Sequence, residues 1–149
     1  MHQITDKLFV GNIHDARQPI SQISALLLVA EEYEIDAPGG VIYERIPFKE
    51  YGDVNSRTLA RAVDWVEQHL SDNRVLVCCR AGMGRSVSVV MAYLCCVDGM
   101  AYGDVLKLVM ARRPGAMPLP KLEETIQEVR HLRTLAHSRT KDSPRNALR

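Results

Sequence analysis

The chain has 149 residues, of which 46% are hydrophobic and 25% charged, a composition typical of one folded domain rather than of a disordered or fibrous segment. Its 19 basic and 18 acidic side chains give a formal net charge of +1, which argues against a surface built as a whole to hold nucleic acid. Residues 133–149 hold five basic side chains and one acid, so residues 1–132 carry a net charge of −3. Any anionic ligand of this part must therefore be bound by a local cluster of residues and not by the overall charge.

The four cysteines stand as two adjacent pairs, Cys78-Cys79 and Cys95-Cys96. A domain of this length can bury a sufficient core without disulfide bonds, and the pairs match neither a secreted disulfide framework nor the spacing of a zinc site. We therefore expect reduced cysteines and a cytoplasmic location. The apolar run at residues 25–30 is too short for a signal peptide or a membrane span, so we expect no membrane span.

The first half of the chain is predicted to form three strands and a helix. Residues 4–11 are typical of a short strand that ends in a turn, and residues 25–30 are a continuous apolar run of the kind found in buried parallel strands. Residues 41–48 are the third strand candidate. Apolar residues keep helical spacing over residues 56–70, which predicts an amphipathic helix.

The second half begins with a short β-branched run at residues 74–79, which predicts a central strand. A turn that contains glycine follows, and then an apolar helix over residues 86–97. Two further helices are predicted at residues 102–112 and 119–137, separated by a segment rich in proline and glycine.

The alternation of strands and helices predicts an α/β fold, with a central, mostly parallel sheet flanked by helices. In such a fold the ligand lies at the carboxyl ends of the strands. Residues 138–149 lack apolar periodicity and are rich in basic side chains. We therefore expect one domain over residues 1–137, followed by a basic, flexible tail, and we favour a monomer.

The segment C-R-A-G-M-G-R-S, which begins at Cys79, lies where the predicted central strand passes into a helix. Such a turn binds anions because its backbone N–H groups are unpaired and the helix dipole is positive there. Its two glycines allow close approach of the backbone, and the planar fork of Arg85 matches two phosphate oxygens. The residues predicted to hold a phosphate group are Arg80, Ala81, Gly82, Met83, Gly84 and Arg85.

Cys79 is expected at the base of this phosphate cradle. The N–H groups and Arg85 that would hold a phosphate dianion also stabilise a thiolate, which is the nucleophilic form of cysteine. Displacement at phosphorus by Cys79 would give a phosphocysteine, and Ser86 can donate a hydrogen bond to the thiolate when it leaves. This chemistry requires no metal and no other cofactor.

The leaving oxygen needs a proton, which a carboxylic acid from another loop would supply. Glu50 and Asp53 both lie in the polar segment after the third predicted strand. The residues alone leave both as candidates for the general acid.

The motif Cys-x5-Arg-Ser, together with this order of elements, resembles the dual-specificity branch of the cysteine-dependent protein tyrosine phosphatases. The resemblance extends to about Arg133 and includes the opening residues 4–12 (ITDKLFVGN), residues 91–94 (MAYL) of the following helix and the late helix end at residues 112–116 (RRPGA). It implies a compact phosphatase-like domain, with the phosphate-binding loop between the central strand and a helix. The substrates it implies are phosphorylated proteins.

The resemblance also assigns roles to single residues. Cys79 is the implied nucleophile, Arg85 the phosphate clamp and Ser86 the group that assists the leaving thiolate. In related sequences the acid stands three positions after a proline, which corresponds to Glu50; Asp53 has the more usual side chain in a less usual place.

One departure from the family pattern stands directly before the nucleophile. The family has histidine there, which orients the loop and favours the thiolate, and this chain has Cys78. A catalytically weak or inactive phosphate-binding module is therefore one alternative function. A phosphatase of a non-protein phosphoester is another, although the loop lacks the lysine that phosphoinositide phosphatases tend to carry.

The shortness of the chain suggests a shallow cleft that admits phosphotyrosine and also phosphoserine or phosphothreonine. The acidic residues 31–34 follow the second predicted strand. We expect them to edge the cleft and to favour basic residues beside the phosphorylated residue of a substrate.

Overall fold

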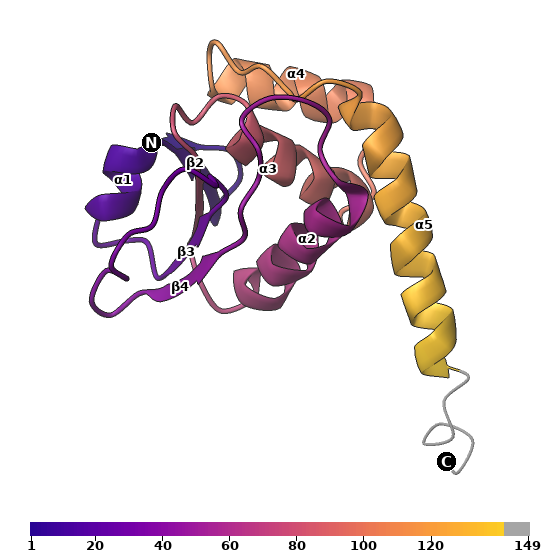
Figure 1. The fold of residues 1–149 in the computed structure, drawn as a ribbon, viewed down its shortest axis with the longest axis horizontal. Coiled ribbons are helices and arrows are strands. Elements are labelled where there is room, and N and C mark those ends of the chain that lie inside the picture. Colours follow the sequence, from indigo (N-terminus) through magenta and orange to yellow (C-terminus); the bar gives the residue numbers. More distant parts are fainter. Residues whose placement is uncertain (142–149) are drawn as a thin grey trace.

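A computed structural model describes residues 1–141 of the chain. Five strands form one sheet in the order β1-β2-β5-β3-β4. Figure 1 labels β2, β3 and β4 of this sheet. Strands β2, β5, β3 and β4 run parallel, and β1 pairs antiparallel with β2. The bounds are β1 His2–Gln3, β2 Leu8–Gly11, β3 Ala25–Leu28, β4 Ile42–Arg45 and β5 Val75–Cys78. The predicted α/β fold with a central, mostly parallel sheet is confirmed.

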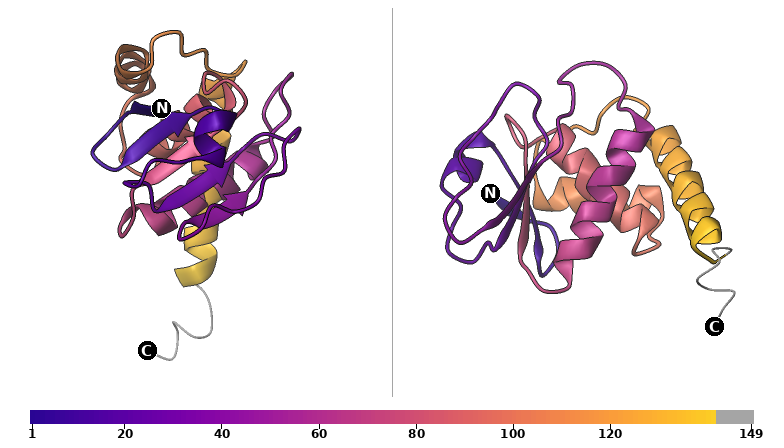
Figure 2. Two further views of the ribbon diagram at one scale, coloured as in Figure 1. Left: turned by 90° about the vertical axis from the view of Figure 1, so that its left-hand side faces the viewer. Right: turned by 60° about the horizontal axis from the view of Figure 1, so that its bottom comes forward.

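Every residue of β2, β3 and β5 is buried, as expected for parallel strands that are covered on both faces. Figure 2 shows helix α1 on one face of the sheet and the other helices on the opposite face. Helix α3 lies between the sheet and the outer helices, so all its residues from Arg85 to Cys95 are buried. The helices are α1 Ile13–Arg17, α2 Ser56–Leu70, α3 Arg85–Cys96, α4 Tyr102–Arg112 and α5 Leu122–Lys141.

The prediction of one strand over residues 4–11 was wrong in its first half. The chain turns there, since the N–H groups of Ile4 and Thr5 both donate to the carbonyl of Leu8. The residues before the turn form β1. Helix α1 was not predicted, because five residues are too few to show helical periodicity.

The start of helix α1 is nevertheless marked in the sequence by the residues of a capping box, Asn12 and Asp15. The Asn12 side chain accepts a hydrogen bond from the Asp15 N–H (3.0 Å), and the Asp15 carboxylate accepts one from the Asn12 N–H (2.9 Å). This reciprocal pair ends β2 and starts the helix within a single turn. It therefore fixes the backbone that follows the first parallel strand.

The last helix differs from the expectation at both ends. Helix α5 was predicted over residues 119–137, and it spans Leu122–Lys141. The first residues of the predicted tail are thus helical, and residues 142–149 lie outside the described residues. None of the helices within residues 1–141 has both the length and the apolar character that a membrane span requires.

Helix α2 has the predicted bounds and begins at an asparagine cap. The Asn55 side chain accepts hydrogen bonds from the N–H groups of Arg57 (2.9 Å) and Thr58 (3.1 Å). Both groups would otherwise lack a partner in the first turn.

We therefore expect Asn55→Ala to lower the free energy of unfolding by about 1 kcal/mol, because alanine cannot cap. Asn55→Ser retains a capping oxygen and should stay within a few tenths of a kcal/mol of the wild type. Urea denaturation of the three proteins tests this. Equal losses for the serine and alanine variants would show that the cap is not the source of the effect.

Candidate active site

The segment from residue 79 to residue 85 leaves the carboxyl end of β5 as a tight loop and enters α3. The Arg80 carbonyl accepts a hydrogen bond from the Ile13 N–H (3.2 Å) at the start of α1. The Gly84 carbonyl accepts two, from the backbone N–H (2.9 Å) and the hydroxyl (2.7 Å) of Ser88. Both ends of the loop are thus held by neighbouring helices.

The middle of the loop is held by the segment that ends α4. Arg113 donates from Nε to the Gly82 carbonyl (3.0 Å) and from Nη2 to the Ala81 carbonyl (3.4 Å). The Met83 carbonyl accepts from the Met117 N–H (2.8 Å). In a trans peptide the N–H points away from the C=O. Because the carbonyls of residues 80–84 are bonded to groups around the loop, the amides that follow them turn toward its interior, where an anion would lie.

Gly82 brings the loop into direct contact with the backbone that follows β2. Its φ angle is +71°, and a Cβ there would stand 2.8 Å from the carbonyl carbon and oxygen of Gly11. The Cys79 N–H donates to the same Gly11 carbonyl (3.3 Å). Only glycine combines the left-handed conformation with this close approach. The glycine of the loop motif at position 82 is therefore required for steric reasons.

Cys79 directly follows β5 at the start of the loop and is buried. Its Sγ atom is 3.2 Å from the Oγ atom of Ser86 in the first turn of α3. The Ser86 hydroxyl can therefore donate to the sulfur when the latter carries negative charge. The N-terminus of α3 points at the same place and adds a favourable dipole.

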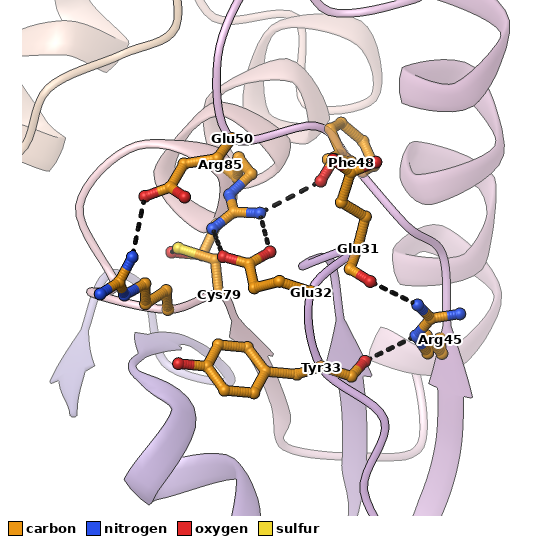
Figure 3. Close-up of polar contacts among 10 residues, drawn as sticks. Glu31, Glu32, Tyr33, Arg45, Phe48, Glu50, Cys79 and Arg85 are labelled. Carbon is orange, nitrogen blue, oxygen red and sulfur yellow. Dashed lines mark hydrogen bonds and ion pairs between the residues drawn. The ribbon is translucent and has the colours of Figure 1, made fainter.

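Arg85 is buried, and its guanidinium is held by two groups in the carboxyl-end loops of β3 and β4 (Figure 3). Nη1 donates to Glu32 Oε1 (2.6 Å) and to the Phe48 carbonyl (3.1 Å), while Nη2 donates to Glu32 Oε2 (2.7 Å). A guanidinium has five N–H donors. No hydrogen bond between described residues uses the other two, which are the Nε–H and the second hydrogen of Nη2. These two lie along one edge and form the fork that an anion needs.

Glu32 is kept in place by the edge strand β4. Arg45 donates from Nε to the Tyr33 carbonyl (2.7 Å) and from Nη2 to the Glu31 carbonyl (2.8 Å), so the segment around Glu32 is bound on both sides (Figure 3). The hydrogen bond from Arg85 lowers the pKa of Glu32 from its ordinary value of 4.5, against the opposing effect of burial. Glu32 is thus a carboxylate at neutral pH.

The two candidate acids occupy different places. Glu50 lines the cleft above Cys79, a hollow of about 400 Å³, and its Oε1 lies 3.5 Å from Arg80 Nη1. Asp53 is not among the lining residues of this cleft; its Oδ2 lies 3.7 Å from Lys121 Nζ. Gly52, with a φ angle of +92°, turns the chain between the two carboxylates.

Cys78, in the position that histidine holds in the family pattern, is the last residue of β5. It pairs with Gly11 of β2 and Leu28 of β3, and both neighbours contribute to its burial. Burial raises the pKa of the Cys78 thiol well above its ordinary value, so Cys78 is a neutral thiol. It cannot supply the positive charge that an imidazolium would.

Comparison with known proteins identifies the group to which this site belongs. The profile of the dual specificity phosphatase catalytic domain matches residues 8–131. The chain belongs to the dual specificity phosphatase family. The family predicted from the Cys-x5-Arg loop is confirmed, and with it the enzyme class of protein-tyrosine and dual-specificity phosphatases.

The relatives of this phosphatase include dual specificity protein phosphatase 1B of Arabidopsis thaliana, 28% identical over 134 residues that cover 86% of this chain and 80% of the relative. Dual specificity protein phosphatase 22 of Mus musculus is 31% identical, with coverage of 86% and 72%. The chain spans just over half (56%) of dual specificity protein phosphatase 15 of Rattus norvegicus. The crystal structure of DUSP15 matches with a TM-score of 0.77 and 25% identity over 92% of this chain and 94% of that one.

Two residues of the site in this phosphatase were missed by the sequence analysis. Glu32 was placed in an acidic segment that edges the cleft, and the structure instead turns its carboxylate onto Arg85. Arg113 belonged to a quoted family motif but was given no role, and its side chain holds two loop carbonyls. The signal for Glu32 was its position after a buried parallel strand, at the edge of the sheet where ligands bind.

Loss of the Arg113 side chain should loosen the loop and weaken anion binding. We expect Arg113→Met to bind tungstate about tenfold more weakly than the wild type, since no other side chain within residues 1–141 donates to the Ala81 and Gly82 carbonyls. Isothermal titration with sodium tungstate tests this. Arg112→Met is the matched control, because Arg112 is exposed in the last turn of α4. Equal affinity in the two variants would contradict the prediction.

The ion pair between Glu32 and Arg85 should contribute a pH-dependent part of the stability. Because the pKa of Glu32 is lowered in the folded state, its contribution is present above pH 4.5 and disappears as the pH falls through the folded value. We expect Glu32→Gln to be about 1–2 kcal/mol less stable than the wild type at pH 7, and the difference to shrink as the pH falls below 4.5. Urea denaturation across this range measures it.

Glu34→Gln is the control for this prediction, because the Glu34 side chain is 86% exposed. A difference between Glu32→Gln and the wild type that stayed constant from pH 7 down to the pH at which the wild type unfolds would show that the charge of Glu32 is not responsible.

Proposed function

We propose that this phosphatase hydrolyses phosphotyrosine and phosphoserine or phosphothreonine in proteins, without a metal, through a phosphocysteine on Cys79. One observation carries the proposal. The buried Cys79 sulfur lies at the base of a loop whose carbonyls are bonded outward, beside an arginine that keeps one edge of two donors unused. The arrangement supplies a nucleophile and a dianion site in one place.

In the first step the Cys79 thiolate attacks phosphorus, and the bond between phosphorus and the substrate oxygen breaks. The loop amides and the free edge of Arg85 bind the three equatorial oxygens, whose charge must be held through the transition state. The leaving oxygen takes a proton from Glu50. We assign this proton to Glu50 rather than to Asp53 because Glu50 lines the cleft that contains Cys79.

In the second step a water molecule attacks the phosphocysteine. The Glu50 carboxylate takes a proton from this water, and the bond between sulfur and phosphorus breaks to release inorganic phosphate. The Ser86 hydroxyl, 3.2 Å from Sγ, donates to the departing thiolate. Cys79 and Glu50 are thereby returned to their starting states.

Glu32 and the Phe48 carbonyl act before the substrate arrives. They satisfy three donors of the buried Arg85 and so fix its orientation, while the edge toward the loop stays available. The guanidinium needs no rotation to meet the phosphate, which reduces the reorganisation in the reaction.

A phosphate-binding module without turnover is the second candidate. It is favoured by Cys78, a neutral thiol where the family pattern has a histidine. Such a module would bind phosphoproteins in the same loop and leave the ester intact.

The two candidates differ in the hydrolysis of phenyl phosphate and p-nitrophenyl phosphate in EDTA. We expect turnover by the wild type and none by Cys79→Ser. Glu50→Gln should lower kcat about 100-fold for phenyl phosphate and less for p-nitrophenyl phosphate, because p-nitrophenolate leaves without a proton. Asp53→Asn is the matched control and should keep the wild-type rate.

Turnover that survives Cys79→Ser would contradict the phosphocysteine mechanism. A larger loss in Asp53→Asn than in Glu50→Gln would contradict the assignment of the acid. Tungstate binding by a wild type that hydrolyses neither ester would establish the binding module instead.

A further inference from the structure

Exposed apolar side chains gather at the mouth of the catalytic cleft. Among the described residues the exposed large apolar side chains are Met1, Ile20, Ile42, Tyr51, Met83, Met110, Met117 and Leu135. Tyr51 (82% exposed), Met83 and Met117 (70%) line the cleft around Cys79, and Met110 (51%) lines the hollow beside it. Exposed apolar surface that collects in one place is typical of a binding surface.

The second hollow, which we call the flanking groove, lies between α4 and the start of α5. It measures about 430 Å³, and its apolar lining includes Tyr102, Leu106, Met110 and Ala116. The flanking groove and the catalytic cleft share the residues 117–119. This segment is the wall between them, so the two hollows lie side by side.

The shared wall is attached to the phosphate loop. The Met117 N–H donates to the Met83 carbonyl (2.8 Å), and the Leu119 N–H donates to the Ser88 hydroxyl oxygen (2.9 Å). The flanking groove therefore stands at a fixed place relative to the phosphate site. Neighbouring residues of an extended chain are about 3.3–3.6 Å apart. Because the two hollows share one wall, a side chain in the groove and a phosphate in the loop can belong to nearby residues of one substrate chain.

We propose that the flanking groove binds an apolar side chain close in sequence to the phosphorylated residue, so that the preferred substrates are phosphopeptides with leucine, methionine or phenylalanine there. This inference rests on the function proposed above. The flexible side chains of Met110 and Met117 suit a site that accepts several apolar shapes.

The charges at the mouth favour a peptide over an anionic membrane. Arg80 is paired with Glu50 (3.5 Å) and Lys121 with Asp53 (3.7 Å), and Glu123 and Glu124 also line the groove. A surface that docks on anionic lipid carries unpaired basic residues around its apolar centre. The mouth of this cleft is apolar and mixed in charge.

The flanking groove also changes the expected substrate preference, which the acidic residues 31–34 had suggested to be for basic flanking residues. Glu32 of that segment is bonded to Arg85, and Glu34 lies 3.9 Å from Arg45. Because the Glu32 carboxylate is occupied by Arg85, this segment offers less charge to a basic substrate. The apolar groove is the stronger determinant of the flanking residue.

The test uses phosphotyrosine peptides that are identical except at the three positions on each side, where each position holds leucine, serine or aspartate. We expect kcat/KM to be about tenfold higher for leucine than for serine at one or more of these positions, with phenyl phosphate as the common reference. The double variant Met110→Ser and Met117→Ser should abolish this preference. Leu135→Ser, at an exposed apolar position on α5, is the matched control and should retain it.

The outcomes separate the groove from the proposed function. Hydrolysis of phenyl phosphate with equal kcat/KM for all peptides, or a preference that the double variant keeps, would overturn the groove alone. If the wild type hydrolyses nothing, the proposed function fails, and the groove is tested by fluorescence titration of Cys79→Ser with the same peptides. Sedimentation with phosphatidylserine vesicles that only the double variant loses would assign the surface to a membrane and overturn the peptide site.

Discussion

The ion pair between Arg85 and Glu32 is the interaction on which the site depends. A buried guanidinium without a counter-charge is costly, and one that is fully bonded cannot receive a phosphate. Glu32 meets both requirements, since it bonds the two terminal nitrogens and leaves the edge with Nε open. The order of the strands brings Glu32 and Arg85 together, because β3 lies next to β5 and the loops after both strands meet at the carboxyl edge of the sheet. Arg45 on β4 then holds the Glu32 segment by its carbonyls.

The connection between α4 and α5 has two tasks at once. Arg113 and the Met117 N–H hold three carbonyls of the phosphate loop, and the same stretch forms the wall between the cleft and the flanking groove. The segment that orders the loop is thus covalently continuous with the wall of the proposed substrate groove. A ligand that displaces this wall would disturb the loop amides, because the Arg113 side chain and the Met117 N–H hold the loop carbonyls.

The sequence was most informative where the signals are contiguous. The phosphate loop, helix α2 and the buried parallel strands could be predicted because a motif, a period of 3.6 residues or an apolar run is visible within a short window. Glu32 and Arg113 could not be assigned, because their partners Arg85 and Gly82 lie 53 and 31 residues away and their approach depends on the order of strands and the end of α4. The choice between Glu50 and Asp53 depends on the turn at Gly52, which the sequence shows only as a glycine.

The contact between Gly82 and Gly11 has a consequence for the tolerance of the fold to mutation. A Cβ at position 82 meets the main chain of Gly11, which has no rotamer to change, whereas a Cβ at position 11 meets first the carboxylate end of Asp15 at 2.8 Å. The two positions should therefore differ in their tolerance to substitution. Position 11 can accept a small residue only when both Asp15, whose Cβ is also 3.0 Å away, and the Leu76 side chain at 3.2 Å shift, and the movement of Asp15 weakens the cap on α1. Position 82 can change only if the β2–α1 junction itself is displaced, so these two distant segments must vary together.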